Sequence, residues 1–221
     1  SLGSNLLSNA SGLMKEELRH FDSLLVKIAD ESKVPAGQAL AVDREGFSEK
    51  ITNYLRNMEN IEIINEEVEE LPKEGYVLVT SGPLTSDSLF ESIKKETGES
   101  DLYFYDAVAP IVTLESIDKE KVYFQSRYDK GDGEYINCPM NKEEYENFYN
   151  ELINAERFPL KSHEEEKIFE ACMPVERIAT RGFQTLLYGP LKPKGLTNPR
   201  TETRDFAVVQ LRQDDKEGKL Y

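Results

Sequence analysis

The sequence predicts a mixed α/β fold in two parts. In the first part, apolar residues recur at helical spacing, and a short apolar run, Tyr76–Thr80, leads through a glycine-containing turn into another helix. This arrangement is typical of a buried parallel strand in an α/β sheet. After Gly98 the sequence changes to shorter strands with alternating aromatic residues. We therefore expect an α/β segment at 1–98 and an α+β domain at 99–221.

Two helices are expected in the first sixty residues. The first spans about 11–32, because its apolar side chains fall three and four residues apart on one stripe, and Pro35 prevents its continuation. That stripe consists of Met14, Leu18, Phe21, Leu25 and Ile28. The second helix begins after Asp43 as its N-cap, with Val42 and Phe47 spaced as a hydrophobic staple across the cap.

The turn after Tyr76–Thr80 contains Gly82, Pro83 and Leu84, and a helix from about 86 to 95 follows it. Such a turn directs backbone N–H groups beyond the carboxyl end of the strand, which suits a phosphate or another electron-rich ligand. The alternative is an ordinary strand-to-helix turn, in which Gly82 only supplies a backbone conformation that other residues resist.

The remaining expected elements are short strands and one further helix. Asn141 and Glu144 have capping-box spacing at the start of a helix expected over 141–155. Strands are expected at 62–70, 102–105, 109–114 and 122–124.

The total charge argues against a nucleic-acid partner, but the distribution of charge does not. The formal net charge is -15, whereas phosphate binding requires local positive charge. The segment 177–204 nevertheless carries six basic residues and one acid. Its candidates for RNA contact are Arg177, Arg181, Lys192 and Lys194. Phe183 and Tyr188 lie close enough in sequence to stack on bases. The alternative for the lysine-containing stretch is a solvated turn between strands.

Cys172 is the candidate reactive thiol. Pro174 suits the first turn of a helix and Gly182 the position just after its end, so a short helix is expected over 174–181. Cys172 would lie at the N-terminal edge of this helix, where the positive end of the helix dipole favours the thiolate. The alternative is a buried cysteine that only fills space.

The other cysteine and the two histidines predict no further chemistry. Cys138 precedes a proline at the end of an expected strand, and we interpret it as structural. Neither cysteine has a second cysteine or histidine at ligand spacing, so no metal site and no disulfide framework are expected. His20 and His163 lack an evident partner, which disfavours a histidine-dependent nucleophile.

The sequence also predicts the compartment. It contains no run of eighteen apolar residues, and its first thirty residues do not form a signal peptide. We expect a cytoplasmic protein without a membrane partner, and the sequence leaves its oligomeric state open.

Several stretches distributed along the chain together resemble one family. They are Leu7–Arg19, Val34–Gly37, Ala39–Phe47, Gly82–Asp87, Tyr103–Ala107, Ser126–Gly131, Asn137–Met140, Phe169–Pro174 and Val208–Asp214. The chain is similar to the folate- and FAD-dependent tRNA (uracil-5-)-methyltransferases. The resemblance implies formation of 5-methyluridine in the T-loop of tRNA. Methylenetetrahydrofolate would donate the carbon, and NAD(P)H would supply reducing equivalents through FAD.

The resemblance also implies a role for each part of the chain. The family assigns the cysteine of its Cys-Met-Pro motif to the uracil chemistry, and Cys172 occupies that position. Gly82, with Pro83 and Leu84, stands where the family brings a strand end to the flavin. Residues 1–98 would then form the middle of a Rossmann-like FAD-binding domain. The second part would be an insertion domain on the tRNA side.

One feature of the family is missing from the sequence. The chain lacks the Gly-x-Gly-x-x-Gly fingerprint that holds the pyrophosphate of a dinucleotide. We therefore expect an internal fragment that does not hold FAD tightly and is inactive alone. The competing hypothesis is a non-catalytic module that binds tRNA or a protein partner.

Overall fold

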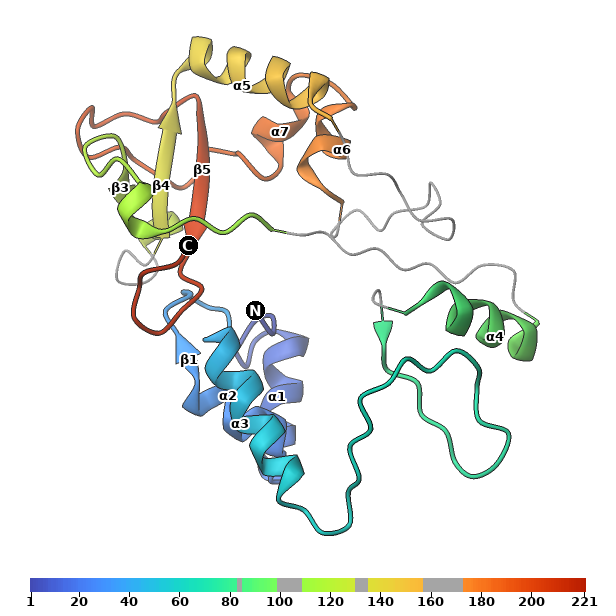
Figure 1. Cartoon of the computed structure of the whole chain (residues 1–221). Coiled ribbons are helices and arrows are strands. Elements are labelled where there is room, and N and C mark those ends of the chain that lie inside the picture. The colour runs from blue at the N-terminus through green and yellow to red at the C-terminus, as the bar shows by residue number, and fades with distance from the viewer. Residues whose placement is uncertain (83–84, 99–108, 130–134, 157–172) are drawn as a thin grey trace.

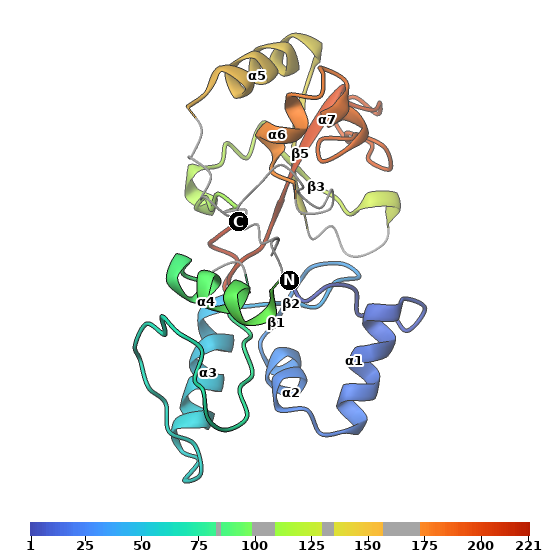
Figure 2. The same cartoon turned by 90° about the vertical axis from the view of Figure 1, so that its right-hand side faces the viewer.

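The computed structural model describes residues 1–82, 85–98, 109–129, 135–156 and 173–221. The predicted mixture of helices and strands is confirmed. Both sheets within these residues are antiparallel, so the expected parallel sheet is absent from them. Figure 2 shows two groups of elements, with α1 to α3 in one and the larger sheet with α5 to α7 in the other.

The predicted helix over 11–32 is two helices rather than one. Helix α1 spans Ala10–His20 and α2 spans Leu24–Glu31. Asp22 separates them with φ 52°, a left-handed conformation that a continuous helix cannot contain. Arg19 joins the two helices, because its Nε and Nη2 donate to the carboxylate of Asp30 at 2.8 and 2.9 Å. The apolar period alone does not reveal this reversal of the chain.

A short hairpin leads into the next helix. Strands β1 (Lys33–Val34) and β2 (Ala41–Val42) pair, and α3 (Arg44–Arg56) follows. Asp43 caps α3 as predicted, with its carboxylate accepting from the Gly46 amide at 2.8 Å. A cap of this kind satisfies one of the amides that a helix start leaves unpaired.

The predicted strands at 62–70 and Tyr76–Thr80 are wrong. The chain has no regular secondary structure over 61–80, and the side chains of Tyr76 and Leu78 are exposed. A strand is stable only when a neighbour pairs with its backbone, and none of the described residues pairs with this segment. The helix that follows is confirmed as α4 (Asp87–Thr97), which Ser86 caps.

The larger sheet has the order β3, β4, β5. Its strands are β3 (Tyr123–Phe124), β4 (Tyr135–Met140) and β5 (Ala207–Arg212), with Asn137 of β4 opposite Gln210 of β5. Within 109–114, only Thr113 bridges, to Leu220, so the predicted strand there is not confirmed. The expected strand at 102–105 lies outside the described residues.

Three helices pack near one end of this sheet (Figure 1). They are α5 (Lys142–Asn154), α6 (Val175–Ala179) and α7 (Thr185–Tyr188). The predicted capping box is present at the start of α5, where the Asn141 and Glu144 side chains bond each other's backbone amides. The core between these elements consists of Tyr145, Ala179, Leu186, Leu191 and Ala207.

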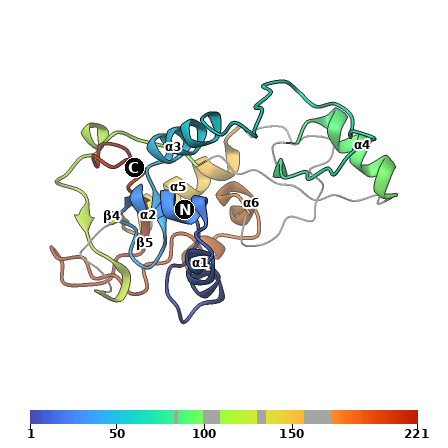
Figure 3. The same cartoon turned by 90° about the horizontal axis from the view of Figure 1, so that it is seen from below.

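Polar contacts join the α1 to α3 group to the sheet. Tyr135 Oη donates to the carbonyl of Ala36 at 3.0 Å. Arg44 pairs with Asp214 at 2.9 Å, and the Lys216 amide donates to Asp43 Oδ2 at 3.2 Å. Helix α4 lies apart from both groups in Figures 1 and 3. The predicted boundary near residue 99 falls outside the described residues and stays a prediction.

None of the described helices is long and apolar enough to cross a membrane.

Asp43→Ala should destabilise the intact protein by about 1–2 kcal/mol, because it removes the α3 cap and a contact to the sheet group. The hydrogen bond from the Gly46 amide, followed by that from Lys216, holds the pKa of Asp43 below its usual range. A lowered carboxyl pKa stabilises the fold above about pH 4, and this contribution disappears as the pH falls through the folded-state pKa.

Denaturant unfolding of the Asp43 variant across pH tests this expectation. Glu49→Ala, at an exposed position of the same helix, is the matched control and should change stability by less than about 0.5 kcal/mol. A difference between Asp43→Ala and the parent that stays constant from pH 7 to pH 2.5 would contradict the role given to the carboxylate.

Candidate functional site

The structure places some of the predicted site residues and leaves others undescribed. Cys172, Pro83 and Leu84 lie outside the described residues. Gly82, Arg177, Arg181, Lys192 and Lys194 are described, and they lie in three separate segments of the chain.

Gly82 occupies a turn that its own neighbours stabilise. Its φ is 57°, and a Cβ atom there would meet nothing within 4 Å. The Thr85 hydroxyl donates to the Gly82 carbonyl at 2.6 Å and lies 2.7 Å from the Ser81 hydroxyl. The left-handed conformation matches the ordinary-turn interpretation. The open space beside the backbone also allows close approach of a ligand, so both interpretations remain compatible with the turn.

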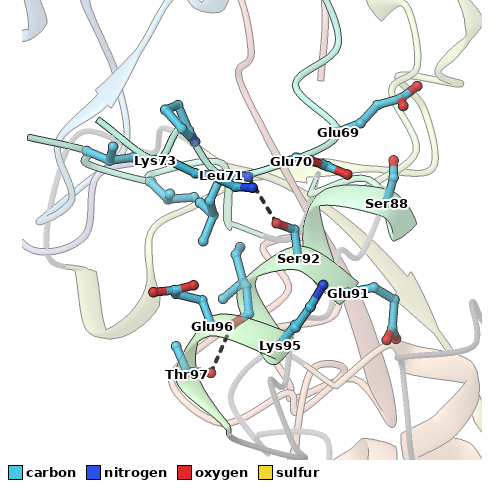
Figure 4. A pocket seen from close by; sticks show the side chains of 14 residues that line it. Glu69, Glu70, Leu71, Lys73, Ser88, Glu91, Ser92, Lys95, Glu96 and Thr97 are labelled. Carbon is cyan, nitrogen blue, oxygen red and sulfur yellow. Dashed lines mark hydrogen bonds between the residues drawn. The ribbon is translucent and has the colours of Figure 1, made fainter. Parts of the chain in front are cut away.

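A cavity of about 940 Å³ lies between the segment 69–79 and helix α4 (Figure 4). The Leu71 amide donates to Ser92 Oγ at 3.0 Å and ties its two walls together. Four glutamates and two lysines contribute to the lining, and Gly82 does not. The predominance of carboxylates makes this cavity unsuited to a phosphate or to RNA, so it is not the predicted ligand site.

The segment that follows Cys172 is fastened to α5 by two tyrosine hydroxyls. Tyr149 Oη donates to the Ala179 carbonyl at 3.1 Å, and Tyr145 Oη donates to the Phe183 carbonyl. Tyr145 is fully buried. Sequence reasoning missed both tyrosines, although their spacing of four residues places them on one helix face. They fix the position of α6, which carries Arg177 and leads to Arg181.

Helix α6 is shorter than predicted. It spans only Val175–Ala179, with Pro174 as its N-cap and Gly182 beyond its end. Five residues align few peptide dipoles, so the helix dipole at this end is weak. The expected influence of the dipole on a nearby thiol is reduced accordingly.

Phe183 and Tyr188 have different roles. The Phe183 ring packs edge-on against Tyr145 and Tyr149, with centroids 4.9 and 5.1 Å away. Phe183 is partly buried and packs against the core, which limits the ring surface left for RNA, and its stacking on bases stays a prediction. Tyr188 is 81% exposed at the end of α7, so its ring remains available to a partner.

The loop that carries Lys192 and Lys194, called the lysine loop below, is held in place through its backbone. The Leu191 side chain is buried in the core, and its carbonyl accepts from the Val208 amide of β5 at 3.1 Å. Arg127 Nη1 then donates to the carbonyls of Lys192 and Lys194 at 2.7 and 2.8 Å. Both lysine residues are exposed, and within the described part of the chain neither has an ion-pair partner.

Arg127 was not among the predicted site residues, although the Ser126–Gly131 stretch belongs to the family resemblance. Burial lowers the pKa of its guanidinium, which nevertheless stays charged at neutral pH. The next residue, Tyr128, has φ 59° and donates its amide to the Gly195 carbonyl at 2.7 Å. The two residues thus contact the lysine loop at successive points.

Cys138 lies inside β4 rather than at its end, paired with Val209 of β5. Its side chain is partly buried, and this burial raises the pKa of the thiol. A protonated thiol is a poor nucleophile, which agrees with the structural interpretation of Cys138.

All 221 residues match the protein family described as glucose inhibited division protein A. The chain is 69% identical over its whole length to a protein of Fusobacterium nucleatum named methylenetetrahydrofolate–tRNA-(uracil-5-)-methyltransferase TrmFO. It is 60% identical to the protein of the same name from Natranaerobius thermophilus and 57% identical to that from Ligilactobacillus salivarius. The chain covers 51%, 51% and 50% of these relatives, and so spans about half their length.

Gly195→Ala should displace the Tyr128 ring. A Cβ at Gly195 would lie 2.9–3.0 Å from three ring carbons of Tyr128, and φ at Gly195 is already +85°. Gly218→Ala is the matched control, because Gly218 has φ +68° and its added Cβ would make only ordinary contacts. We expect Gly195→Ala to destabilise the protein by about 1 kcal/mol more than the control, measured by denaturant unfolding. Equal losses for the two variants would show that the ring is not packed against Gly195.

Proposed function

The chain belongs to the glucose inhibited division protein A family, and from this premise we propose that the protein is a cytoplasmic tRNA (uracil-5-)-methyltransferase. It would use methylenetetrahydrofolate as the carbon donor and NAD(P)H as the reductant, and would form 5-methyluridine in the T-loop. The observation that carries this proposal is 69% identity, along the whole chain, to a relative with that name.

Cys172 is the residue we assign to the uracil chemistry. Cys172 begins a Cys-Met-Pro motif, and the methyltransferases that the chain resembles place their catalytic cysteine in this motif. A thiolate can add to C6 of uracil, which makes C5 nucleophilic, or it can remove the proton from C5 after the carbon is attached. The other cysteine, Cys138, is held within a strand and has a raised thiol pKa, so it does not compete for this role.

FAD, when bound, supplies the hydride chemistry that reduces the transferred methylene group to methyl. The open backbone at Gly82 is compatible with a flat ring system, and Gly82, Pro83 and Leu84 would border it. The sequence lacks the pyrophosphate-binding fingerprint, so these residues would form one edge of a flavin site and not the whole of it.

Arg177, Arg181, Lys192 and Lys194 are proposed to contact the tRNA backbone. Arg177 and Arg181 follow Cys172 on α6 and its C-terminal turn, and the two lysines occupy the loop after α7. A protein with a net charge of -15 must concentrate positive charge where it meets phosphates. These residues provide that concentration in a segment connected directly to the proposed thiol.

Cys172→Ala in the intact enzyme should abolish methylation of a T-loop transcript and leave FAD bound, because the thiol acts on uracil and not on the flavin. The flavin absorbance reports cofactor content, and transfer of label from methylenetetrahydrofolate reports activity. Cys138→Ala is the matched control and should keep most of the activity. Normal turnover by Cys172→Ala would exclude the assigned role, and loss of FAD would indicate a structural one.

The double substitution Lys192→Ala, Lys194→Ala should weaken tRNA binding. It should also reduce the slope of log Kd against log salt concentration by about 1–2, because each phosphate contact releases about one counterion. Lys121→Ala combined with Lys142→Ala removes the same charge elsewhere, from exposed lysines paired with Asp118 and Glu146. Binding titrations at several salt concentrations should leave the slope of that control near the parent value. An identical slope for both double variants would remove the lysine loop from the interface.

A further inference from the structure

A chain of polar side chains runs from the middle of the sheet to the lysine loop. Asn137 is fully buried in β4 and donates from Nδ2 to the carbonyl of Gln125 at 2.9 Å. Its Oδ1 accepts from Gln210 Nε2 at 2.8 Å, and Gln210 Oε1 accepts from Arg127 Nε at 2.6 Å. The orientation of the Arg127 guanidinium is therefore set from inside the sheet.

The other side of the guanidinium faces the loop. Its Nη1 donates to the carbonyls of Lys192 and Lys194, the residues on either side of Pro193. The acceptors at Nε and Nη1 are thus all neutral oxygens, so these bonds do not cancel the positive charge of Arg127.

Two more contacts fasten the same loop further along. The Tyr128 amide donates to the Gly195 carbonyl at 2.7 Å, and the Thr197 amide donates to Gln125 Oε1 at 3.0 Å. The segment Gln125–Tyr128 thereby holds the loop backbone from Lys192 to Thr197. An exposed turn of proline, glycine and lysine residues would otherwise lose considerable backbone entropy when a ligand orders it.

We propose that Arg127, oriented by Gln210 and Asn137, is a positioning residue that fixes the Lys192–Lys194 backbone in the geometry in which it meets an RNA phosphate backbone. This inference rests on the proposed function, since it takes tRNA as the ligand. The two lysines supply the charge, and Arg127 removes the ordering penalty that a free loop would incur on binding. The guanidinium acts through the loop and need not touch the RNA.

A double-mutant cycle on tRNA binding in the intact protein tests the proposal. Arg127→Met keeps much of the side-chain volume but frees the loop backbone. It should weaken tRNA binding about tenfold, because binding must then order roughly one loop residue that Arg127 holds in place in the parent protein. In the Lys192→Ala, Lys194→Ala background the same substitution should change binding by less than about twofold, because the loop no longer contributes. Additive losses in the two backgrounds would overturn the proposal, as would unchanged binding by Arg127→Met.

Arg200 provides a matched control for a merely structural effect. Its guanidinium also donates to two backbone carbonyls, those of Lys119 and Val122. Within the described residues, neither of these acceptors belongs to the lysine loop. Arg200→Met should have the same effect on binding with and without the two lysines. A cycle in which Arg200 couples to the lysines as strongly as Arg127 does would contradict a specific role for Arg127.

A second variant covers the case in which Arg127→Met does not fold. Gln210→Met removes the acceptor at Arg127 Nε while leaving the guanidinium in place, and it should show the same coupling to the lysines with a smaller loss of binding. Methylation at saturating tRNA should keep its kcat in both variants. If the mutant cycle shows the expected coupling in tRNA binding but the parent protein does not methylate tRNA, the proposed function is refuted and this inference stands.

Discussion

The buried amide of Asn137 is the interaction on which the arrangement of the C-terminal part depends. It lies on the central strand β4, where it bonds the segment after β3 on one side and Gln210 of β5 on the other. A buried amide left without partners would be strongly destabilising, so the network favours one register of the three strands. The same network continues through Arg127 to the lysine loop, and thus links sheet register to the placement of surface charge.

A second set of interactions connects that sheet to the N-terminal helices. Asp43 caps α3 and also accepts the amide of Lys216, and Arg44 beside it pairs with Asp214. The segment 61–80 differs, because most of its apolar side chains are exposed, although the Leu71 amide bonds Ser92 of α4 beside the cavity that the two elements line. Exposed apolar runs of this kind usually mark surfaces that another part of an assembly covers.

The sequence predicted best what is decided locally. The caps at Asp43 and Asn141 follow from side chains within three residues of a helix start, and both are present. Tyr76–Thr80 was mistaken for a strand because strand formation depends on a distant partner that no local pattern supplies. The role of Arg127 depends on contacts with Gln210 and Lys192, 83 and 65 residues away, so the candidate loop was recognised and the residue that holds it was not.

Hydrogen exchange at individual amides measures most directly whether this network holds the lysine loop. In the parent protein the Tyr128 amide donates to the Gly195 carbonyl, and the Thr197 amide donates to the Gln125 side chain. The Val208 amide of β5 donates instead to the Leu191 carbonyl. The account predicts that Arg127→Met accelerates exchange at Tyr128 and Thr197 by about tenfold or more and leaves Val208 protected. Unchanged protection at Tyr128 and Thr197 would contradict it, and so would equal loss at all three amides.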